Sequence, residues 1–78
     1  MSTRVYVLLD LLDGKSDQMI RTVHGKPGVV MADTLDGSPN AVVVIQAGDR
    51  HKLAQFTVRV ISSIEPMTQS LQLLATRD

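Results

Sequence analysis

The sequence predicts a ferredoxin-like α+β fold with the element order βαββαβ. Three observations lead to this fold class. Four apolar stretches have the length of strands, two amphipathic stretches lie after the first and third of them, and only a short turn separates the middle two. Right-handed crossovers, found in about 98% of such units, place both helices on one side of a four-stranded antiparallel sheet. The 78 residues are expected to form one domain, spanning residues 1–78.

The first and third strands are apolar on both faces. The first is predicted over residues 4–12, where only Asp10 interrupts an apolar face. Asp10 marks either the rim of an interface or a pairing with a basic residue across that interface. The third strand, Ala41–Ala47, reads Ala-Val-Val-Val-Ile-Gln-Ala. A strand of this kind needs cover on both faces, and so short a chain has few elements to provide it.

Two helices are predicted between the strands. The first begins near Ser16, a good N-cap residue, and ends at Gly25, ahead of Pro27. The second follows an N-cap at Asp49 and ends at Glu65–Pro66, because proline cannot continue a helix. The apolar stripes recur every three or four residues, as Met19, Ile20 and Val23 in the first helix and as Leu53, Phe56, Thr57, Val60, Ile61 and Ile64 in the second.

The second and third strands form a predicted hairpin. The second strand covers residues 29–35, and only Asp36–Asn40 separates it from the third. A connection of Asp, Gly, Ser, Pro and Asn is typical of a turn between antiparallel strands. The fourth strand is predicted over Thr68–Ala75, with leucines on both of its faces.

One face of this sheet has no cover within the chain, since both helices lie on the other face. An exposed apolar patch larger than a few hundred Å² usually marks an interface. The chain has no cysteine for disulfides, so oligomerisation is the remaining way to support a small core. We therefore expect two sheets to pack face to face in a homodimer. The expected interface residues are Tyr6, Leu8, Leu12, Val42, Val44 and Leu74.

Composition argues against several classes of function. Lys and Arg balance Asp and Glu at eight each, and the two aromatic residues are too few for stacking bases, so no nucleic-acid partner is expected. Without cysteine, and with His24 and His51 far apart, neither a metal site nor a cofactor is expected. The sequence shows no secretion signal and no apolar run of about 20 residues, so we expect a cytoplasmic protein without a membrane partner.

A binding module is expected rather than an enzyme. No carboxylate pair, activated nucleophile or base triad can be assembled by spacing. Asp13-Gly14-Lys15-Ser16 lacks the Walker pattern and reads as a turn followed by a helix cap. An enzyme would need a cavity inside the dimer, as in small monooxygenases with a dimeric α+β barrel, and the apolar sheet face offers few groups to orient a substrate.

Several short motifs follow one another in a fixed order. They are Tyr6-Val7-Leu8-Leu9, Lys26-Pro27-Gly28-Val29, Leu35-Asp36-Gly37-Ser38-Pro39-Asn40 with the valines that follow, Ala47-Gly48-Asp49 and Ile64-Glu65-Pro66-Met67-Thr68-Gln69-Ser70. Together they resemble the effector-binding domain of the Lrp/AsnC family of feast/famine regulators, also called the regulation of amino-acid metabolism (RAM) domain. The family's hairpin loop reads glycine, any residue, aromatic, aspartate; this chain keeps Gly37 but has Pro39 and Asn40 at the last two positions. Pro66-Met67 likewise replaces the family's Gly-Val before the fourth strand.

The resemblance implies a non-enzymatic regulatory module that binds a small effector. Family members pair sheet to sheet, their dimers often associate further into rings, and effectors, commonly amino acids, bind between dimers near the hairpin loop. The chain begins at the first strand, so the family's helix-turn-helix and its DNA binding are not expected here. The implied ligand-binding residues are Gly37, Ser38, Pro39, Asn40, Thr68 and Ser70.

Two alternatives remain open at this stage. Asp36–Asn40 has the composition of an ordinary hairpin turn, and Thr68 and Ser70 can be plain strand residues. The whole chain also fits an assembly chaperone of the NapD-like type, which shares the fold, the length and a similar Pro-Gly-Val at Pro27-Gly28-Val29. Such chaperones hold a twin-arginine signal peptide with the sheet side, so this chain would be a monomer with a free sheet face.

Overall fold

The computed structural model describes residues 3–76 and confirms the βαββαβ order. Predicted strand ends differ from the observed ones by no more than one residue, and those of the third strand are identical. The elements are β1 (Thr3–Leu11), α1 (Ser16–Val23), β2 (Val29–Thr34), β3 (Ala41–Ala47), α2 (Arg50–Ile64), the short 3-10 helix η1 (Glu65–Met67) and β4 (Thr68–Thr76).

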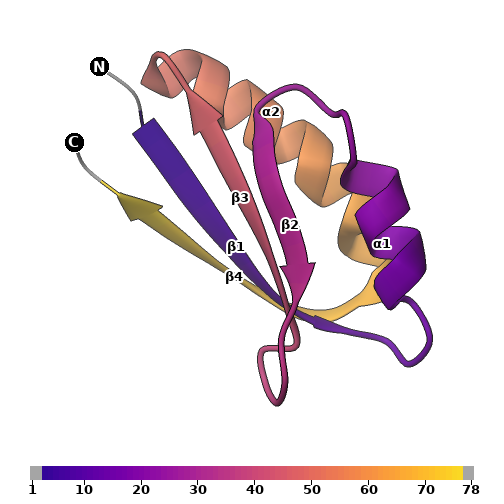
Figure 1. Cartoon of the computed structure of the whole chain (residues 1–78). Coiled ribbons are helices and arrows are strands. Elements are labelled where there is room, and N and C mark those ends of the chain that lie inside the picture. The colour runs from indigo at the N-terminus through magenta and orange to yellow at the C-terminus, as the bar shows by residue number, and fades with distance from the viewer. Residues whose placement is uncertain (1–2, 77–78) are drawn as a thin grey trace.

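The four strands form one antiparallel sheet in the order β2-β3-β1-β4, and both helices cover the same side of it (Figure 1). The register determines which side chains share a face. Val7 lies opposite Val43 in β3 and Leu73 in β4, on the helix side. Tyr6 lies opposite Val44 and Leu74, on the side without helices. We call these the covered face and the open face.

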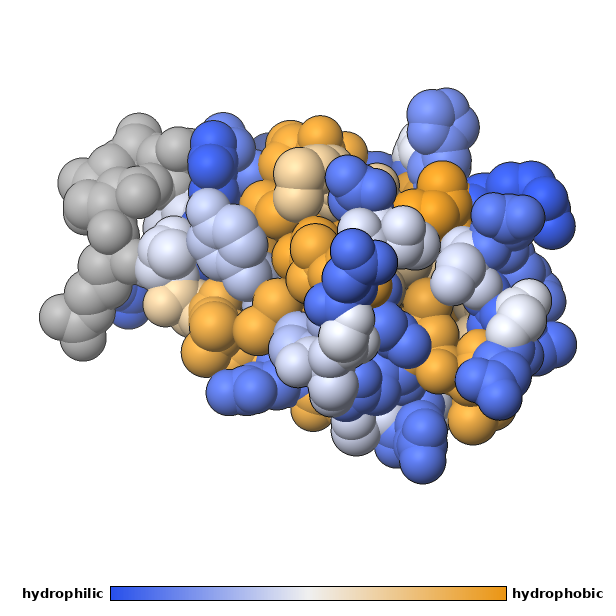
Figure 2. Space-filling model, turned by 60° about the horizontal axis from the view of Figure 1, so that its bottom comes forward, coloured by the Kyte–Doolittle hydropathy of each residue, from blue (hydrophilic) through white to orange (hydrophobic). Residues whose placement is uncertain are grey.

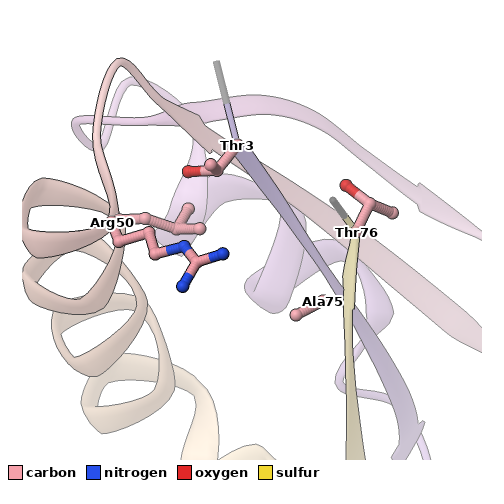
Figure 3. Close-up of a pocket in the computed structure, with 5 residues that line it drawn as sticks. Thr3, Arg50, Ala75 and Thr76 are labelled. Atoms are coloured by element: carbon pink, nitrogen blue, oxygen red, sulfur yellow. The ribbon is translucent and has the colours of Figure 1, made fainter. Parts of the chain in front are cut away.

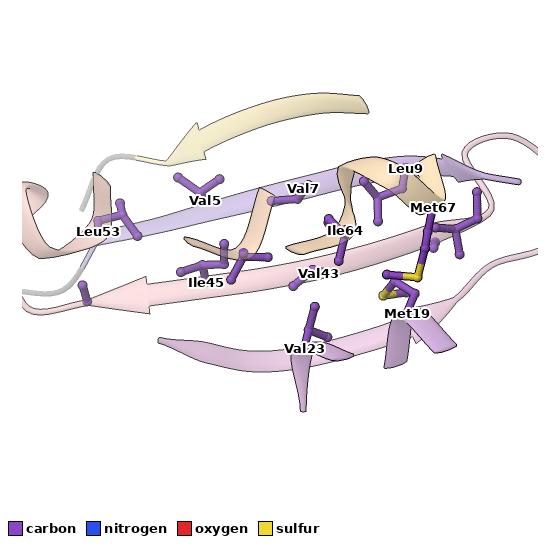
Figure 4. Packing of buried hydrophobic residues seen from close by; sticks show 14 residues of the cluster. Val5, Val7, Leu9, Met19, Val23, Val43, Ile45, Leu53, Ile64 and Met67 are labelled. Atoms are coloured by element: carbon purple, nitrogen blue, oxygen red, sulfur yellow. The ribbon is translucent and has the colours of Figure 1, made fainter. Parts of the chain in front are cut away.

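The covered face carries the hydrophobic core (Figure 4). Alternate residues of the two central strands meet the predicted helix stripes, because sheet residues two apart point the same way. Burying each such side chain contributes about 1.5–3 kcal/mol. The largest fully buried side chains are Val7, Leu9, Val43 and Ile45 from the strands, and Met19, Val23, Val60 and Ile64 from the helices.

Gly28 permits the close approach of α2 to the beginning of β2. Its φ is +85°, and a Cβ at this position would overlap the ring of Phe56. Its carbonyl oxygen accepts a hydrogen bond from the backbone N–H of Gln46 at 2.8 Å, which joins β2 to β3. Glycine therefore meets both a conformational and a steric requirement here.

One predicted helix cap is confirmed and the other is wrong. Asp49 Oδ1 accepts a hydrogen bond from the backbone N–H of Lys52 at 2.8 Å, as expected for an N-cap. Ser16 is instead the first residue of α1, and Lys15 takes the N-cap position without a side-chain bond. The reason is the preceding turn, in which the Lys15 N–H bonds the carbonyl of Leu12 at 3.2 Å and leads directly into the helix.

The open face is buried at its centre and exposed toward its edges. Val42 and Val44 in β3 are only 8% and 3% exposed, although no helix covers them. Side chains standing on the neighbouring strands shield them, since Val44 pairs with both Tyr6 and Met31. The sequence did not predict that the sheet itself would cover much of β3.

The remaining apolar exposure lies outside this centre. Met31 in β2 is 45% exposed and Leu74 in β4 is 47% exposed, while Tyr6 and Leu8 are half-buried. Leu12 lies just beyond the end of β1 and is also exposed. Figure 2 is turned from the view of Figure 1 so that the lower end of the molecule comes forward. It shows apolar surface interspersed with polar residues. Among residues 3–76, no helix is long and apolar enough to cross a membrane.

Candidate functional site

The hairpin loop meets β1 and β4 at the side chain of Asp10. The hydroxyl of Ser38 donates to Asp10 Oδ1 at 2.8 Å and lies 3.0 Å from Oδ2. The hydroxyl of Ser70 donates to Oδ2 at 2.9 Å. Three segments that are 28 and 60 residues apart in the sequence therefore converge on one carboxylate.

A hollow of about 300 Å³ opens beside this cluster. This volume is at the lower end for small-molecule sites, which suits a ligand of amino-acid size. The hollow combines polar groups with apolar walls, and no basic side chain lines it. Its lining residues are Leu8, Asp10, Ser38, Pro39, Ser70, Leu71 and Gln72.

Three of the six predicted ligand residues, Ser38, Pro39 and Ser70, line this hollow together. Thr68 lies in a neighbouring hollow of about 370 Å³ between β4 and the end of α2, and its hydroxyl donates to the carbonyl of Ile64 at 2.7 Å. Gly37 is exposed at the loop with a φ of +90°, and no atom lies within 4 Å of where its Cβ would be.

Asn40 anchors the loop to the sheet. Its side-chain Oδ1 accepts a hydrogen bond from the backbone N–H of Leu11 at 2.9 Å, beyond the last paired residues of β1 and β3. Its own N–H donates to the carbonyl of Leu9 at 2.9 Å, and its carbonyl accepts from Leu35 at 2.8 Å. The side-chain oxygen is thus engaged within the fold, and its amide nitrogen is the group left to offer a ligand.

Within residues 3–76, the hydrogen-bond partners of Asp10 are serine hydroxyls. A pairing of Asp10 with a basic residue across the interface stays a prediction. The sequence did single out Asp10, as the charge that interrupts the apolar face formed by Tyr6, Leu8 and Leu12. It gave no means of connecting Asp10 with Ser38 and Ser70, because that contact depends on how the hairpin loop folds. Within the same residues, no group of three or more His, Asp or Glu side chains is placed to hold a metal ion.

A separate hollow of about 330 Å³ lies at the other end of the sheet (Figure 3). Arg50, at the beginning of α2, extends toward Thr3 and Ala75 there, and the buried hydroxyl of Thr3 has no hydrogen-bond partner in the described structure. Thr3 and Thr76 adjoin residues 1–2 and 77–78, which lie outside the described range. We therefore assign no site to this hollow.

Neither a protein-family model nor a curated protein matches this sequence. The fold, in contrast, is shared with several solved structures. The chain is similar to FFRP-DM1 at 21% identity and a TM-score of 0.80, over 99% of this chain and 100% of that one. It is similar to hypothetical protein PHS023 from Pyrococcus horikoshii at 20% identity and a TM-score of 0.83, over 100% and 92% of the two chains.

A third similar structure is MtbAldR, at 16% identity and a TM-score of 0.75 over 97% of this chain. The chain spans about half of that protein, 52% of its length. These neighbours include RAM-domain proteins of the FFRP/Lrp family, so the chain has the RAM-type fold that its motifs predicted. At these identities the likeness establishes the fold.

A more distant match is a protein assigned as an antibiotic biosynthesis monooxygenase, from Chloroflexus aurantiacus. It has 14% identity and a TM-score of 0.64, over 100% of this chain and 93% of that one. The same architecture therefore serves more than one class of protein, and function has to be argued from the site.

Proposed function

We propose that this chain is a non-enzymatic regulatory module that forms a homodimer through the open face and binds a small, amino-acid-like effector. The observation that carries this proposal is the hollow built by the hairpin loop against Asp10 and Ser70. Its position fits the predicted effector site beside the loop. The RAM-type fold of the structural neighbours supports the same class of function.

The open face supports pairing with a second copy. A two-fold interface uses the same patch on both subunits, so an apolar patch can pair with itself without a second surface. Leu74 and Met31 remain almost half exposed in one protomer, beside the half-buried Tyr6 and Leu8. Covering such side chains releases free energy roughly in proportion to the apolar area removed from water, about 25 cal/mol per Å².

Leu8 connects the binding site with the proposed interface. It belongs to the open face through its pairing with Val42, and it also lines the hollow beside Asp10. A ligand in the hollow would therefore contact a side chain that a second subunit also contacts. Binding and assembly would then influence each other, because a ligand that favours one assembly state is itself bound more tightly by that state. Association of dimers into rings is a further expectation of the RAM resemblance.

The composition of the hollow supports binding rather than catalysis. Ser38 and Ser70 are its only hydroxyl groups, and its lining includes no histidine or lysine that would act as their general base. Asp10 is its only carboxylate, so the lining offers no acid–base pair.

A second candidate is a chaperone that holds a peptide. The observation that favours it is β4, an edge strand with an exposed leucine on each face: Leu73 is 45% exposed and Leu74 is 47% exposed. An extended peptide can add to such an edge through backbone hydrogen bonds while its side chains meet both leucines. This function needs a monomer with a free edge.

Light scattering during size-exclusion chromatography, followed by thermal unfolding with a panel of amino acids, tests the proposal. We expect a mass twice the 8.5 kDa of one chain. A ligand at 100 times its Kd stabilises the folded state by about 2.7 kcal/mol, which raises the Tm of a domain of this size by about 10–20 °C. A monomer that no amino acid stabilises, but that an extended peptide does, would instead support the chaperone.

A further inference from the structure

The two serine hydroxyls beside Asp10 both donate their hydrogens to its carboxylate. Each hydroxyl carries one hydrogen, and the Ser38 and Ser70 oxygens lie 2.8 Å and 2.9 Å from the carboxylate oxygens that accept them. Since a carboxylate cannot donate, both hydrogens must point at Asp10. The serine oxygens therefore present lone pairs, not hydrogens, to the hollow.

The carboxylate of Asp10 can accept further hydrogen bonds. An ionised carboxylate accepts about four hydrogen bonds, whereas two hydroxyls supply two hydrogens. The short and long contacts of Ser38, 2.8 Å and 3.0 Å, share a single hydrogen between the two carboxylate oxygens. Two serine oxygens and one carboxylate thus form a set of acceptors around one negative charge.

The other residues that line the hollow add no positive charge to this set of acceptors. Leu8, Pro39 and Leu71 are apolar, and the side-chain amide of Gln72 is the remaining polar group of the lining. An anion placed beside Asp10 would meet a like charge and no basic side chain, which is unfavourable at short distance. A group that carries both positive charge and several donors would be favoured instead.

We propose that Asp10, Ser38 and Ser70 bind the primary ammonium group of a small ligand whose apolar body lies against Leu8 and Pro39. An ammonium group has three donors, and the cluster offers three side chains that accept. This inference rests on the proposed effector-binding function and specifies the ligand class, since the charged group recognised is the amine, whether or not the ligand has a carboxylate. It also assigns the charged contact with the ligand to Asp10 in β1. The side-chain oxygen of Asn40 already accepts a hydrogen bond from the backbone N–H of Leu11.

The competing explanation is that the cluster only fastens the hairpin loop to β1 and β4. Asp10→Asn separates the two roles, because an amide oxygen still accepts from both hydroxyls but carries no charge. Asp33→Asn is the matched control: it removes a carboxylate from β2 on the same sheet, where Asp33 pairs with Val42 and bonds the N–H of Thr34. Neither variant should change the Tm of the unliganded protein by more than a few degrees.

Isothermal titration of the full chain with three related compounds tests the proposal. The probes are L-valine, isobutylamine (valine without its carboxylate) and 3-methyl-2-oxobutanoate (valine with a ketone in place of the amine). We expect both amines to bind and the keto acid to fail. Asp10→Asn should weaken amine binding at least tenfold, and Asp33→Asn should leave it within twofold.

Three results would overturn the proposal: binding of the keto acid as tightly as valine, unchanged amine binding in Asp10→Asn, or no binding by either amine at millimolar concentration. Failure of this inference is distinguishable from failure of the proposed function. A dimer stabilised by a compound without an amine contradicts only the ammonium site. A monomer that no amino acid or related acid stabilises contradicts the regulatory module itself.

Discussion

The two faces of the sheet have similar apolar content but differ in how they are covered. On the covered face, Val43 and Ile45 are fully buried beneath the helices. On the open face, Val44 is almost as buried, at 3% exposed, while Leu74 at the edge strand is 47% exposed. The comparison shows that the central strands of a four-stranded sheet shield one another, whereas the edges need another element. An apolar sequence alone therefore does not say which side chains a partner covers.

The faces also differ in their polar groups. The buried polar residue of the covered side is Thr57, whose hydroxyl donates to the carbonyl of Leu53 in the same helix. The open side carries the Asp10 cluster, where hydrogen bonds connect β1, β4 and the hairpin loop. Chemistry suited to a ligand thus lies on the side that also carries the proposed interface.

The largest effect is expected from truncation on the covered face. Ile45→Ala removes a fully buried side chain and leaves a cavity beneath the helices. We expect a loss of about 2–5 kcal/mol in the free energy of unfolding, measured by urea denaturation. A loss under about 1 kcal/mol would contradict the assignment of the core to this face.

The next effect compares two glycines with a positive φ, Gly28 beside α2 and Gly37 in the hairpin loop. Gly28→Ala places a Cβ against the Phe56 ring at a φ of +85°, so strain and overpacking add to about 2–4 kcal/mol. Gly37→Ala has a similar φ but open space around it, and should cost about 1–2 kcal/mol. Equal losses in urea denaturation would show that Phe56 does not pack against Gly28.

Asn40 tests whether the hairpin loop is held by its side-chain oxygen. Asn40→Ala leaves the N–H of Leu11 without its partner and should cost about 1–3 kcal/mol. Asn40→Asp keeps an acceptor oxygen and should recover most of that loss. Identical thermal stability of the two variants would contradict this role.

The smallest effect is expected at the edge of the open face. Leu74→Ala shortens a side chain that is 47% exposed, so the fold of one protomer should lose less than about 1 kcal/mol. Its effect should instead depend on protein concentration, since dimerisation raises the apparent stability by mass action. A Tm difference from the wild type that is the same at all concentrations would place Leu74 outside the interface.

Periodicity was sufficient to predict the fold. The two-sided apolar pattern of Ala41–Ala47 gave the strand its observed ends, and the spacing of Leu53, Val60 and Ile64 identified the buried stripe of α2. These features are local, because alternation and helical spacing follow from backbone geometry. The order of the elements then restricted the topology to very few arrangements.

The site was only partly predictable, because it depends on contacts between distant segments. Ser38, Pro39 and Ser70 were expected near a ligand, and they line one hollow. Asp10, which completes the cluster, was noticed only as an interruption in an apolar face. Neither propensity nor spacing shows that a loop 28 residues away places its hydroxyl on that carboxylate.

Light scattering of two aspartate variants tests the central claim, that the open face pairs with a second copy. Leu74→Asp places a charge at the edge of the open face, whereas Val58→Asp places the same charge on α2 at a valine that is 63% exposed. An unpaired charge buried in an interface costs several kcal/mol, so Leu74→Asp should elute with the 8.5 kDa mass of one chain. The Val58→Asp variant and the wild type should have twice that mass. A wild type with the mass of one chain, or a Leu74→Asp variant with the mass of two, would contradict the account.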